Sequence, residues 1–449
     1  MGTRPVGNLG LPVHPLTYVR QERGWTHQDL VDVIARRIGN SAARREKAWR
    51  WEHWGVIPDA ESQLALAGEL GVPADLVYEL GWPHWLPVGE RINLDAPWTV
   101  AESLGALDAT AGAAMMDRRG FVLLGAGVAA TIAGEWLTVE PPRLAGVLGG
   151  GRIDTGLVNC FERRLPALRQ MDATLGGKNV RGLVDSELRL VTDLLTKGSY
   201  SEAIGQRMFA IAAELGRIAG WTSFDAGYHA AAERYWVAAL RAAHIAGDRG
   251  IGANILKCMS LQRIDTDRTD EALAIAHAAR AGVKHEPPRV IAMLTVREAR
   301  THAGRGNVAD CERLLVEAER LMDRADDVPS PPWAAYFDQA EYSAQVARSY
   351  LRLRRHQATD HWLSQSLTLQ PDERARDRAT YYIWRAHTVL NMGDVEHACA
   401  LVNDAVPDIA IAKSARNQRR LSVIHRRLRQ HSNVDVVAAL DERVRHLIA

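Results

Sequence analysis

Apolar residues recur at helical spacing along most of the chain, and runs that alternate between apolar and polar residues are scarce. Near the N-terminus this pattern predicts a first short helix that starts at His14 and stops at Gly24. A second helix is expected to begin after Thr26, which can act as N-cap with Asp29 in the capping-box position. The second helix should end at Gly39, because glycine readily adopts the left-handed conformation that closes a helix.

A third helix is predicted over residues 42–52, with Ser41 as its cap, and Pro58 marks the turn after it. A fourth and a fifth helix follow from the spacing of Leu64, Leu66, Ala67 and Leu70 and then of Leu76 and Leu80. Five such helices can close a small core. The second and third, joined by a short turn, have the proportions of a helix-turn-helix.

From Ile153 onward the pattern predicts pairs of helices separated by turns. The turn signals are Gly227, Asp267, Gly306, Arg355 and Gly393, with separations of 40, 39, 49 and 38 residues. A period of this length is typical of a helical solenoid rather than of one bundle.

Composition agrees with an all-α chain. It has 449 residues, of which 47% are hydrophobic and 24% charged, as in an ordinary globular protein. At roughly 100–200 residues per domain, this length allows two to four units unless a repeat array forms one long domain. The net charge of +1 excludes a uniformly basic nucleic-acid coat, so any DNA contact must be a local patch.

Such a patch is present in the predicted third helix. Residues 36–50 hold six basic residues and one acid, Glu46, which gives this segment a net charge of +5. We expect the helix to contact DNA phosphates and base edges, with a further phosphate contact at the start of the second helix. The candidate DNA-binding residues are Gln28, Ser41, Arg44, Arg45, Lys47 and Arg50. The alternative is a solvated basic helix in an ordinary bundle. Trp49, Trp51 and Trp54 are expected to serve the core rather than to intercalate.

At these residues the sequence resembles the Xre family of Cro/repressor-like helix-turn-helix regulators. The resemblance is carried by WTHQDLVDVIARR and then AWRWEHWGVIPDAESQLALAGELGVPADLVYEL. The family's third helix commonly ends in Trp-Glu-Arg-Gly, and here Trp51-Glu52-His53-Trp54-Gly55 stands in its place. The resemblance implies specific binding to double-stranded DNA, usually as a homodimer on two half-sites.

The second helices of the later pairs resemble those of tetratricopeptide repeats, as in YHAAAERY, DEALAIA and DVEHACALV. The inner surface of such an array is the natural binding site. We expect a peptide or small-molecule effector there, contacted by Asn254, Tyr336 and Asn391. Other aromatic residues near the first helices are better explained as core: Trp221, Phe224, Trp333, Phe337, Tyr342, Tyr381, Tyr382 and Trp384.

The apolar stretch at residues 115–137 allows three interpretations. Gly125 to Ala130 fits the dinucleotide motif G-x-G-x-x-A, but no βαβ unit follows it. Arg118-Arg119 with the apolar residues behind it is similar to a twin-arginine export signal. That signal would lie far inside the chain, and the uncharged run is shorter than a membrane-spanning helix. We favour the third interpretation, a buried connector helix between the two domains.

A basic run at residues 413–429 contains seven lysines and arginines and no acid. Its apolar positions, Leu421, Ile424 and Leu428, share one helix face. The run is explained either as a capping helix with a solvated basic side, or as a second phosphate-contacting or partner surface.

No catalytic motif is present, so we expect neither an enzyme nor a cofactor. Cys160, Cys258, Cys311 and Cys399 lie far apart, which gives no support for a metal site and fits reduced thiols in the cytoplasm. The start of the chain lacks the apolar run of a secretion signal, and no membrane association is expected.

The sequence thus predicts a helix-turn-helix domain at residues 13–82, a linker with the connector helix at 83–152 and a tetratricopeptide-like domain at 153–449. The expected function is transcriptional regulation by specific DNA binding, with repeats that sense a ligand or dimerise. The alternative is a repeat scaffold for a protein partner, without specific DNA binding. Operator, effector and direction of regulation stay open.

Overall fold

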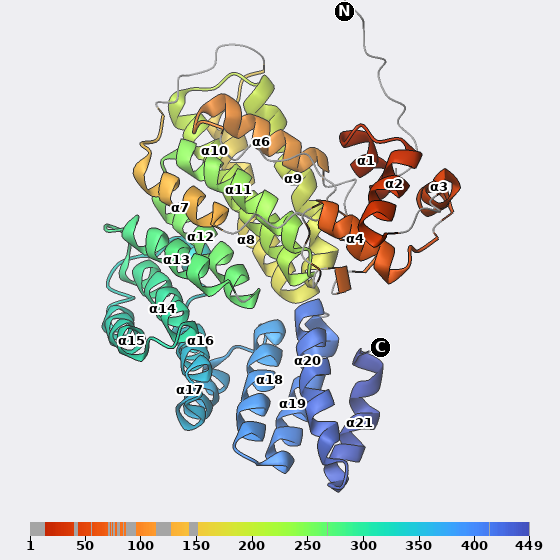
Figure 1. Cartoon of the computed structure of the whole chain (residues 1–449). Helices are drawn as coiled ribbons and strands as arrows, with labels where there is room; N and C mark the ends of the chain where they lie inside the picture. The colour runs from red at the N-terminus through yellow and green to blue at the C-terminus, as the bar shows by residue number, and fades with distance from the viewer. Residues whose placement is uncertain are drawn as a thin grey trace, which may run out of the picture. The chain divides into compact units, whose positions relative to one another are not determined.

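The computed structural model describes residues 14–39, 44–54, 56–70, 96–113, 127–142, 151–266, 268–412 and 414–448, and positions 72, 74, 77–78, 81–83 and 85–86. Within these residues the chain forms helices and no strand, apart from one isolated bridge between Arg152 and Ser199. The predicted all-α class is therefore confirmed. The chain divides into two compact units (Figure 1). The N-terminal unit comprises Met1–Arg91 and Gly112–Leu123, and the C-terminal unit comprises Ile92–Ala111 and Leu124–Ala449.

The described part of the N-terminal unit contains helices α1 (Pro15–Glu22), α2 (His27–Ile38), α3 (Arg45–His53) and α4 (Ala60–Leu70). Helix α2 packs against α3 and α4, and α1 packs against α3. Their apolar faces share a core that includes Leu16, Val19, Leu30, Val31, Ile34, Ala48, Trp51, Leu66 and Ala67, extended by Trp85 and Leu86. Leu76 and Leu80, which predict a fifth helix, lie outside the described residues.

The ends of α2 form as the sequence predicts. Thr26 accepts a hydrogen bond from the Asp29 backbone and the Asp29 side chain accepts one in return, which completes the capping box. Gly39 closes the helix with a left-handed backbone at φ 76°. Helix α3 begins later than predicted, because Arg44 still has an extended backbone and stands at its N-cap. The expected cap, Ser41, lies outside the described residues.

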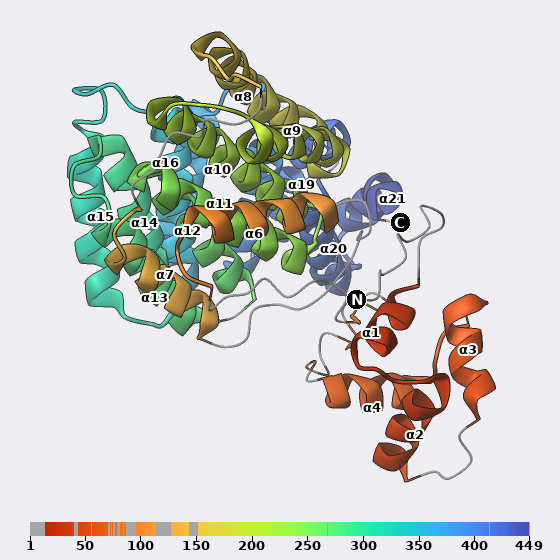
Figure 2. The ribbon, with the colours of Figure 1, turned by 90° about the horizontal axis from the view of Figure 1, so that it is seen from above.

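The C-terminal unit consists mainly of successive helix pairs, and the two helices of each pair pack against one another. The first helices of consecutive pairs also pack together along α10, α12, α14 and α16, as the view from above shows (Figure 2). The pairs are α8 (Thr155–Leu175) with α9 (Gly177–Lys197), α10 (Glu202–Asp225) with α11 (His229–Ala246), α12 (Arg249–Asp265) with α13 (Thr269–Ala281), α14 (Pro288–Gly304) with α15 (Val308–Met322), α16 (Gln339–Arg352) with α17 (His356–Leu369), α18 (Ala375–Asn391) with α19 (Val395–Ala412), and α20 (Ala415–Leu428) with α21 (Asp435–Ile448).

Four of the turns inside these pairs share one geometry: three residues join the helices, and the middle one has a left-handed backbone. The middle residues are Gly227 (φ 87°), Gly306 (φ 75°), Arg354 (φ 57°) and Gly393 (φ 93°). Four of the turn positions predicted from sequence therefore lie in these turns. Gly227, Gly306 and Gly393 are the left-handed residues themselves, and Arg355 directly follows the left-handed Arg354. Asp267 lies outside the described residues.

Two further helices of the C-terminal unit come from the segment that the sequence assigns to a linker with a connector helix. Helix α6 (Val100–Ala113) runs beside α11 in both views (Figures 1 and 2), and Arg241 of α11 donates to the backbone oxygen of Ala96 ahead of it, at 3.0 Å. Helix α7 (Val128–Thr138) packs against α11 and α13. Its Trp136 is fully buried against Gly252 and Gly282, where an added Cβ would lie 2.6 Å from the ring.

Helix α7 accounts for the described part of the apolar stretch. Gly127 donates its backbone N–H to Glu271 at 2.7 Å, and no strand stands beside it in the described residues. The dinucleotide motif therefore has no βαβ unit there, and Gly125 itself lies outside the described residues. In the part of the chain that the structure describes, no helix combines the length and the apolar character needed to cross a membrane. The twin-arginine pair, Arg118-Arg119, lies outside that part.

The series of pairs curls back onto its first member. Helix α8 contacts α18 and α19 although nearly 200 residues separate them in the sequence. Arg376 of α18 forms an ion pair with Asp172 of α8 at 3.0 Å. Ser414, the N-cap of α20, donates to Asp225 at the end of α10 at 2.9 Å. These contacts join early and late pairs, so the first helices surround an interior space.

Candidate functional site

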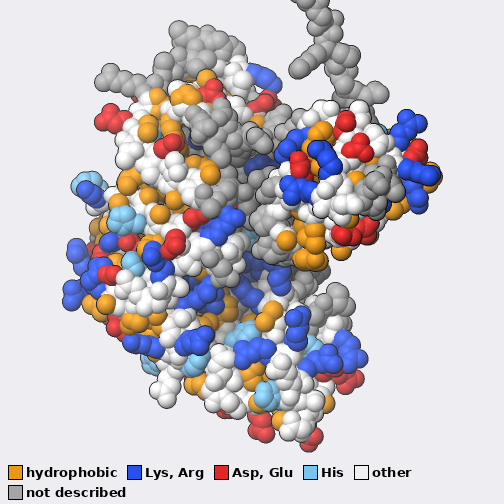
Figure 3. All heavy atoms as spheres, in the orientation of Figure 1, with side chains coloured by type: hydrophobic (Ala, Val, Ile, Leu, Met, Phe, Trp, Pro, Cys, Tyr) orange, Lys and Arg blue, Asp and Glu red, His pale blue; other side chains and the backbone are white. Residues whose placement is uncertain are grey.

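Helix α3 presents its basic residues on the outside of the N-terminal unit. Ala48, Trp51 and Glu52 are buried and hold the helix against the core, while Arg44, Arg45, Lys47 and Arg50 are exposed. In Figure 3 basic side chains gather at the tip where Figure 1 places α3. We call Arg44, Arg45, Lys47 and Arg50 the α3 basic surface.

The α3 basic surface is only weakly engaged with protein acids. Lys47 lies 3.3 Å from Asp59, and Arg45 lies 3.5 Å from Glu46. All four of these side chains are more than half exposed, so the two ion pairs contribute little to stability. The Arg50 guanidinium lies over the Trp54 ring, 5.7 Å from its centroid.

The three tryptophans around α3 do not share one role. Trp51 is a core residue, as predicted, with 2% of its surface exposed. Trp49 and Trp54 are exposed by 39% and 66%, so their assignment to the core is wrong. Trp49 stacks on His53 with ring centroids 4.5 Å apart, on the same outer side as the basic residues. Helical geometry explains the difference, because Trp51 lies three residues from Ala48 on the inner face.

The remaining predicted DNA contacts are placed less favourably. Gln28 is exposed in the first turn of α2, and its amide donates to Asp32 at 2.8 Å. With Asp29 in the same turn, this end of α2 already carries acidic groups. Ser41 lies outside the described residues.

Glu52 ties α1, α2 and α3 together. It accepts hydrogen bonds from Thr17 at 2.8 Å and from Arg20 at 2.7 Å, and lies 3.1 Å from the His27 ring. Burial raises the pKa of Glu52, but these hydrogen bonds outweigh burial and the pKa is lowered. His53 completes a group of potential metal ligands with His27 and Glu52. We interpret the group as an ion-pair cluster, because the Arg20 guanidinium already occupies the carboxylate.

A second site lies inside the C-terminal unit, a cavity of about 230 Å³. Apart from Trp333 and Tyr336, which follow α15, and Arg374, which precedes α18, its side chains come from the first helices of the pairs. They include Arg169 and Asp172 from α8, Arg217, Trp221 and Asp225 from α10, Lys257 from α12, Arg297 and Arg300 from α14, Glu341 from α16, Arg376, Asp377, Tyr381 and Trp384 from α18, and Arg416 and Arg420 from α20. We call this space the inner cavity.

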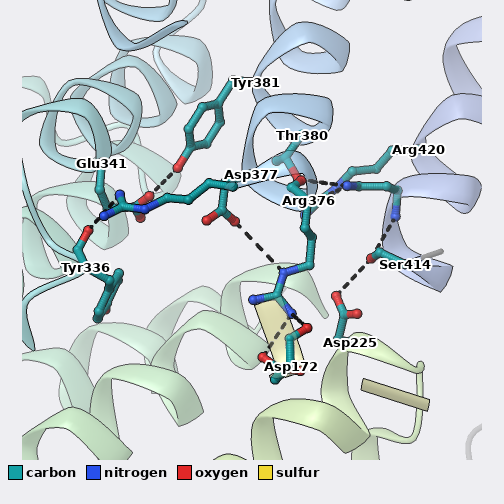
Figure 4. A network of polar contacts seen from close by, with 12 residues as sticks. Asp172, Asp225, Tyr336, Glu341, Arg376, Asp377, Thr380, Tyr381, Ser414 and Arg420 are labelled. Carbon is teal, nitrogen blue, oxygen red and sulfur yellow. Dashed lines mark hydrogen bonds and ion pairs between the residues drawn. The ribbon is translucent and has the colours of Figure 1, made fainter. Parts of the chain in front are cut away.

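The walls of the inner cavity are strongly basic. Nine lysine and arginine side chains face four carboxylates, Asp172, Asp225, Glu341 and Asp377. Figure 4 shows Arg376 reaching from α18 to Asp172, and Tyr381 pointing at Glu341, to which it donates a hydrogen bond. Burial raises the pKa of Glu341 to about 7, so this acid carries only part of a full negative charge near neutral pH.

The predicted effector-binding residues are divided between the cavity and its surroundings. Tyr336 lines the cavity and accepts a hydrogen bond from Lys257. Asn254 is buried one helical turn before Lys257, and neither atom of its amide has a hydrogen-bond partner among the described residues. Asn391 is exposed at the end of α18 and accepts from Arg427 at 2.6 Å, so it is not part of the cavity.

Four aromatic residues assigned to the core also line the cavity: Trp221, Trp333, Tyr381 and Trp384. Trp333, Tyr381 and Trp384 are buried as predicted, and Trp221 is half-buried. The basic residues of the C-terminal run, 413–429, divide between inward and outward positions. Its apolar face packs in the core as predicted, through Leu421, Ile424 and Leu428. Arg416 and Arg420, however, turn inward with side chains only 14% and 21% exposed, and both face Asp265. A solvated basic side is therefore correct only for positions such as Arg426.

Sequence reasoning missed the arginines of α14. Arg297 and Arg300 lie three residues apart within VREAR, a pattern that also fits a solvated charged face.

No model of a known protein family matches the chain, and a search of curated proteins finds no similar sequence.

Proposed function

We propose that the protein is a transcriptional regulator that binds double-stranded DNA through α2 and α3 and holds an effector in its C-terminal unit. The observation that carries the proposal is the α3 basic surface, four exposed cations on a short helix whose opposite face is fixed in the core. The capped α2 and the α3 packed on it support the helix-turn-helix interpretation, together with the resemblance to Xre regulators.

The chemistry of these side chains suits DNA. Arginine can donate two parallel hydrogen bonds to guanine or to phosphate, and lysine adds a point charge. The exposed rings of Trp49 and Trp54 border the cations and can contact sugar or base-methyl groups. As the family resemblance implies, we expect a homodimer on two half-sites.

The C-terminal unit supports the effector part of the proposal. Its first helices surround the inner cavity, as expected for the inner face of a tetratricopeptide-like array. An effector that joins α8, α14 and α20 can favour one arrangement of these helices only if it binds that arrangement more tightly than others.

DNA binding is tested by enriching a random duplex pool with the purified full-length protein at near-physiological salt. We expect an inverted repeat to be recovered, with binding that weakens as salt rises by a slope of about 0.9 per phosphate neutralised. Arg45→Ala and Arg50→Ala should each weaken binding by about tenfold or more, since one specific contact is worth ~1–3 kcal/mol.

The matched control is Arg320→Ala, because Arg320 is also an exposed arginine on a helix, α15, but belongs to the C-terminal unit. It should bind DNA like the parent. Melting temperatures should be nearly equal in all three variants, since each change is on the surface. If Arg45→Ala and Arg50→Ala bind like the parent, α3 is not the recognition helix. If no duplex is enriched, the scaffold alternative replaces the regulator.

A further inference from the structure

The charges around the inner cavity do not balance. Behind the nine cations and four acids of its wall stand three further acids, Glu214, Asp265 and Asp338. Asp338 pairs with Arg374 at 2.9 Å. Glu214 is shared by Arg169 at 2.8 Å and Arg217 at 2.7 Å. Asp265 faces three arginines of the wall: Arg416 at 3.4 Å, Arg300 at 3.6 Å and Arg420 at 4.0 Å. The cavity therefore keeps an excess of buried positive charge.

The excess is concentrated on α14. Arg297 is 8% exposed, and its Nε and Nη1 atoms have no hydrogen-bond partner among the described residues. Arg300 is 2% exposed, and its Nε and Nη2 atoms are equally without one. Burial lowers the pKa of Arg297 and lowers that of Arg300 well below its usual range. A guanidinium stays protonated near neutral pH. Arg297 has no ion pair among the described residues, and Arg300 shares Asp265 with Arg416 and Arg420, so the two groups together lack negative charge.

Lys257 on α12 adds a third cation to the same wall. It is buried, and its ammonium contacts the Tyr336 hydroxyl and the Met293 sulfur at 3.5 Å, but no carboxylate among the described residues. Burial lowers its pKa to about 8, so it is mostly charged at neutral pH.

The aromatic residues of the cavity hold cations in place. The Arg420 guanidinium lies 5.3 Å from the Trp384 ring centroid, and Arg416 lies 5.5 Å from that of Trp221. Such contacts restrict the rotamers of long side chains before any ligand arrives. Lys257 is held in the same way, 4.9 Å from the Tyr336 ring centroid, so these three cations are oriented in advance.

We propose that the inner cavity binds a small organic anion whose carboxylate or phosphate groups are held by Arg297, Arg300 and Lys257. The guanidinium fork of arginine matches both groups through paired hydrogen bonds. A volume of about 230 Å³ corresponds to roughly eight water molecules, which suits a metabolite-sized anion and is too small for a folded element. The inference rests on the proposed function only in making this anion the effector.

The test measures binding without DNA, so it is independent of the first experiment. Full-length protein is titrated calorimetrically with pyrophosphate and with citrate, and its melting temperature is recorded against sodium chloride of equal ionic strength. We expect at least one of the two anions to bind and to raise the melting temperature, and their comparison distinguishes phosphate from carboxylate. Chloride alone should not reproduce the effect.

Two substitutions locate the site. Arg297→Met and Arg300→Met should each weaken binding by about tenfold or more, because each removes a charge-assisted contact. Neither should lower the melting temperature of the ligand-free protein, since Arg297 has no ion pair among the described residues and Asp265 keeps Arg416 and Arg420 when Arg300 is removed. Arg297→Lys should recover part of the affinity, and the exposed Arg320→Ala should change nothing.

Three results would overturn the proposal. One is that neither anion stabilises the protein beyond the chloride reference. The second is that both methionine variants bind the anion with the affinity of the parent. The third is that the methionine variants melt well below the parent without ligand, which would make the two arginines structural.

Discussion

Arg354 offers a direct test of the geometry that relates the helix pairs. It occupies the middle of the α16–α17 turn at φ 57°, where the other three described turns of this kind have glycine. The left-handed conformation costs a residue with a Cβ about 1–2 kcal/mol. Glycine loses more conformational entropy on folding than alanine, which costs roughly 0.5–1 kcal/mol. Arg354→Gly should therefore stabilise the protein by about 0.5–1 kcal/mol.

Little is lost with the side chain itself. Arg354 is exposed, and within the described residues it takes part in no ion pair. Its backbone N–H donates to Leu351 at 3.1 Å, a hydrogen bond that glycine keeps. In thermal unfolding of the full chain we expect a rise of about 1–3 °C in melting temperature.

Two controls separate backbone from side-chain effects. Arg354→Ala keeps the left-handed cost and should change stability by less than about 0.5 kcal/mol. Gly306→Ala introduces that cost at φ 75°, where an added Cβ meets nothing within 4 Å, and should destabilise by about 1 kcal/mol. The reasoning is refuted if Arg354→Gly lowers the melting temperature, or if Gly306→Ala leaves it unchanged.

Three further predictions concern single buried contacts. Burial raises the pKa of Glu341 from its ordinary 4.5 to about 7, so the native state binds more protons than the unfolded state between these pH values. The free energy of unfolding should therefore fall as pH rises from 4.5 through 7. Glu341→Gln should lack this fall when unfolding is compared at pH 5 and pH 8. The pKa of Glu52 is lowered in the folded protein, so the stability that Glu52 contributes is present above its ordinary pKa and is lost as pH falls through its folded-state pKa. Glu52→Gln should lower the free energy of unfolding by about 1–3 kcal/mol at pH 7, because it weakens the contact with Arg20, and urea unfolding measures this loss. Gly220→Ala should destabilise by about 1–3 kcal/mol, because the new Cβ would lie 2.3 Å from the indole nitrogen of the buried Trp236.

Each of the three has a contrary outcome. A pH dependence in Glu341→Gln equal to that of the parent would mean that this carboxyl does not titrate as argued. Equal urea midpoints for Glu52→Gln and the parent would remove Glu52 as the link between the first three helices. For Gly220→Ala the control is Gly105→Ala in α6, whose added Cβ meets nothing within 4 Å and which should not destabilise; equal effects of the two changes would exclude the steric argument.

The sequence by itself determined the local structure, because helix ends depend on residues close to one another in the chain. Thr26 and Asp29 form the capping box that their spacing predicts. Gly227, Gly306 and Gly393 occupy the turns that their spacing predicts, since glycine adopts positive φ at little cost. In the turn between α16 and α17 the sequence pattern marks Arg355, which lies in the turn, but gives no signal that Arg354 takes the left-handed conformation. The α3 basic surface was also evident, because a short helix with one buried face leaves its charges outside.

The tertiary structure decided which charges face inward. Arg416 and Arg426 stand on one helix and are the same residue type, yet the first lines the inner cavity and the second is exposed. The hydrophobic periodicity identifies the apolar face of α20. Whether the positions beside that face contact water or another helix depends on the packing of α8 against α18 and α19. The same closure buries Arg297 and Arg300, whose sequence pattern is that of a solvated face. A charge is defined by the sequence, whereas its solvation is set by segments that only the folded chain brings together.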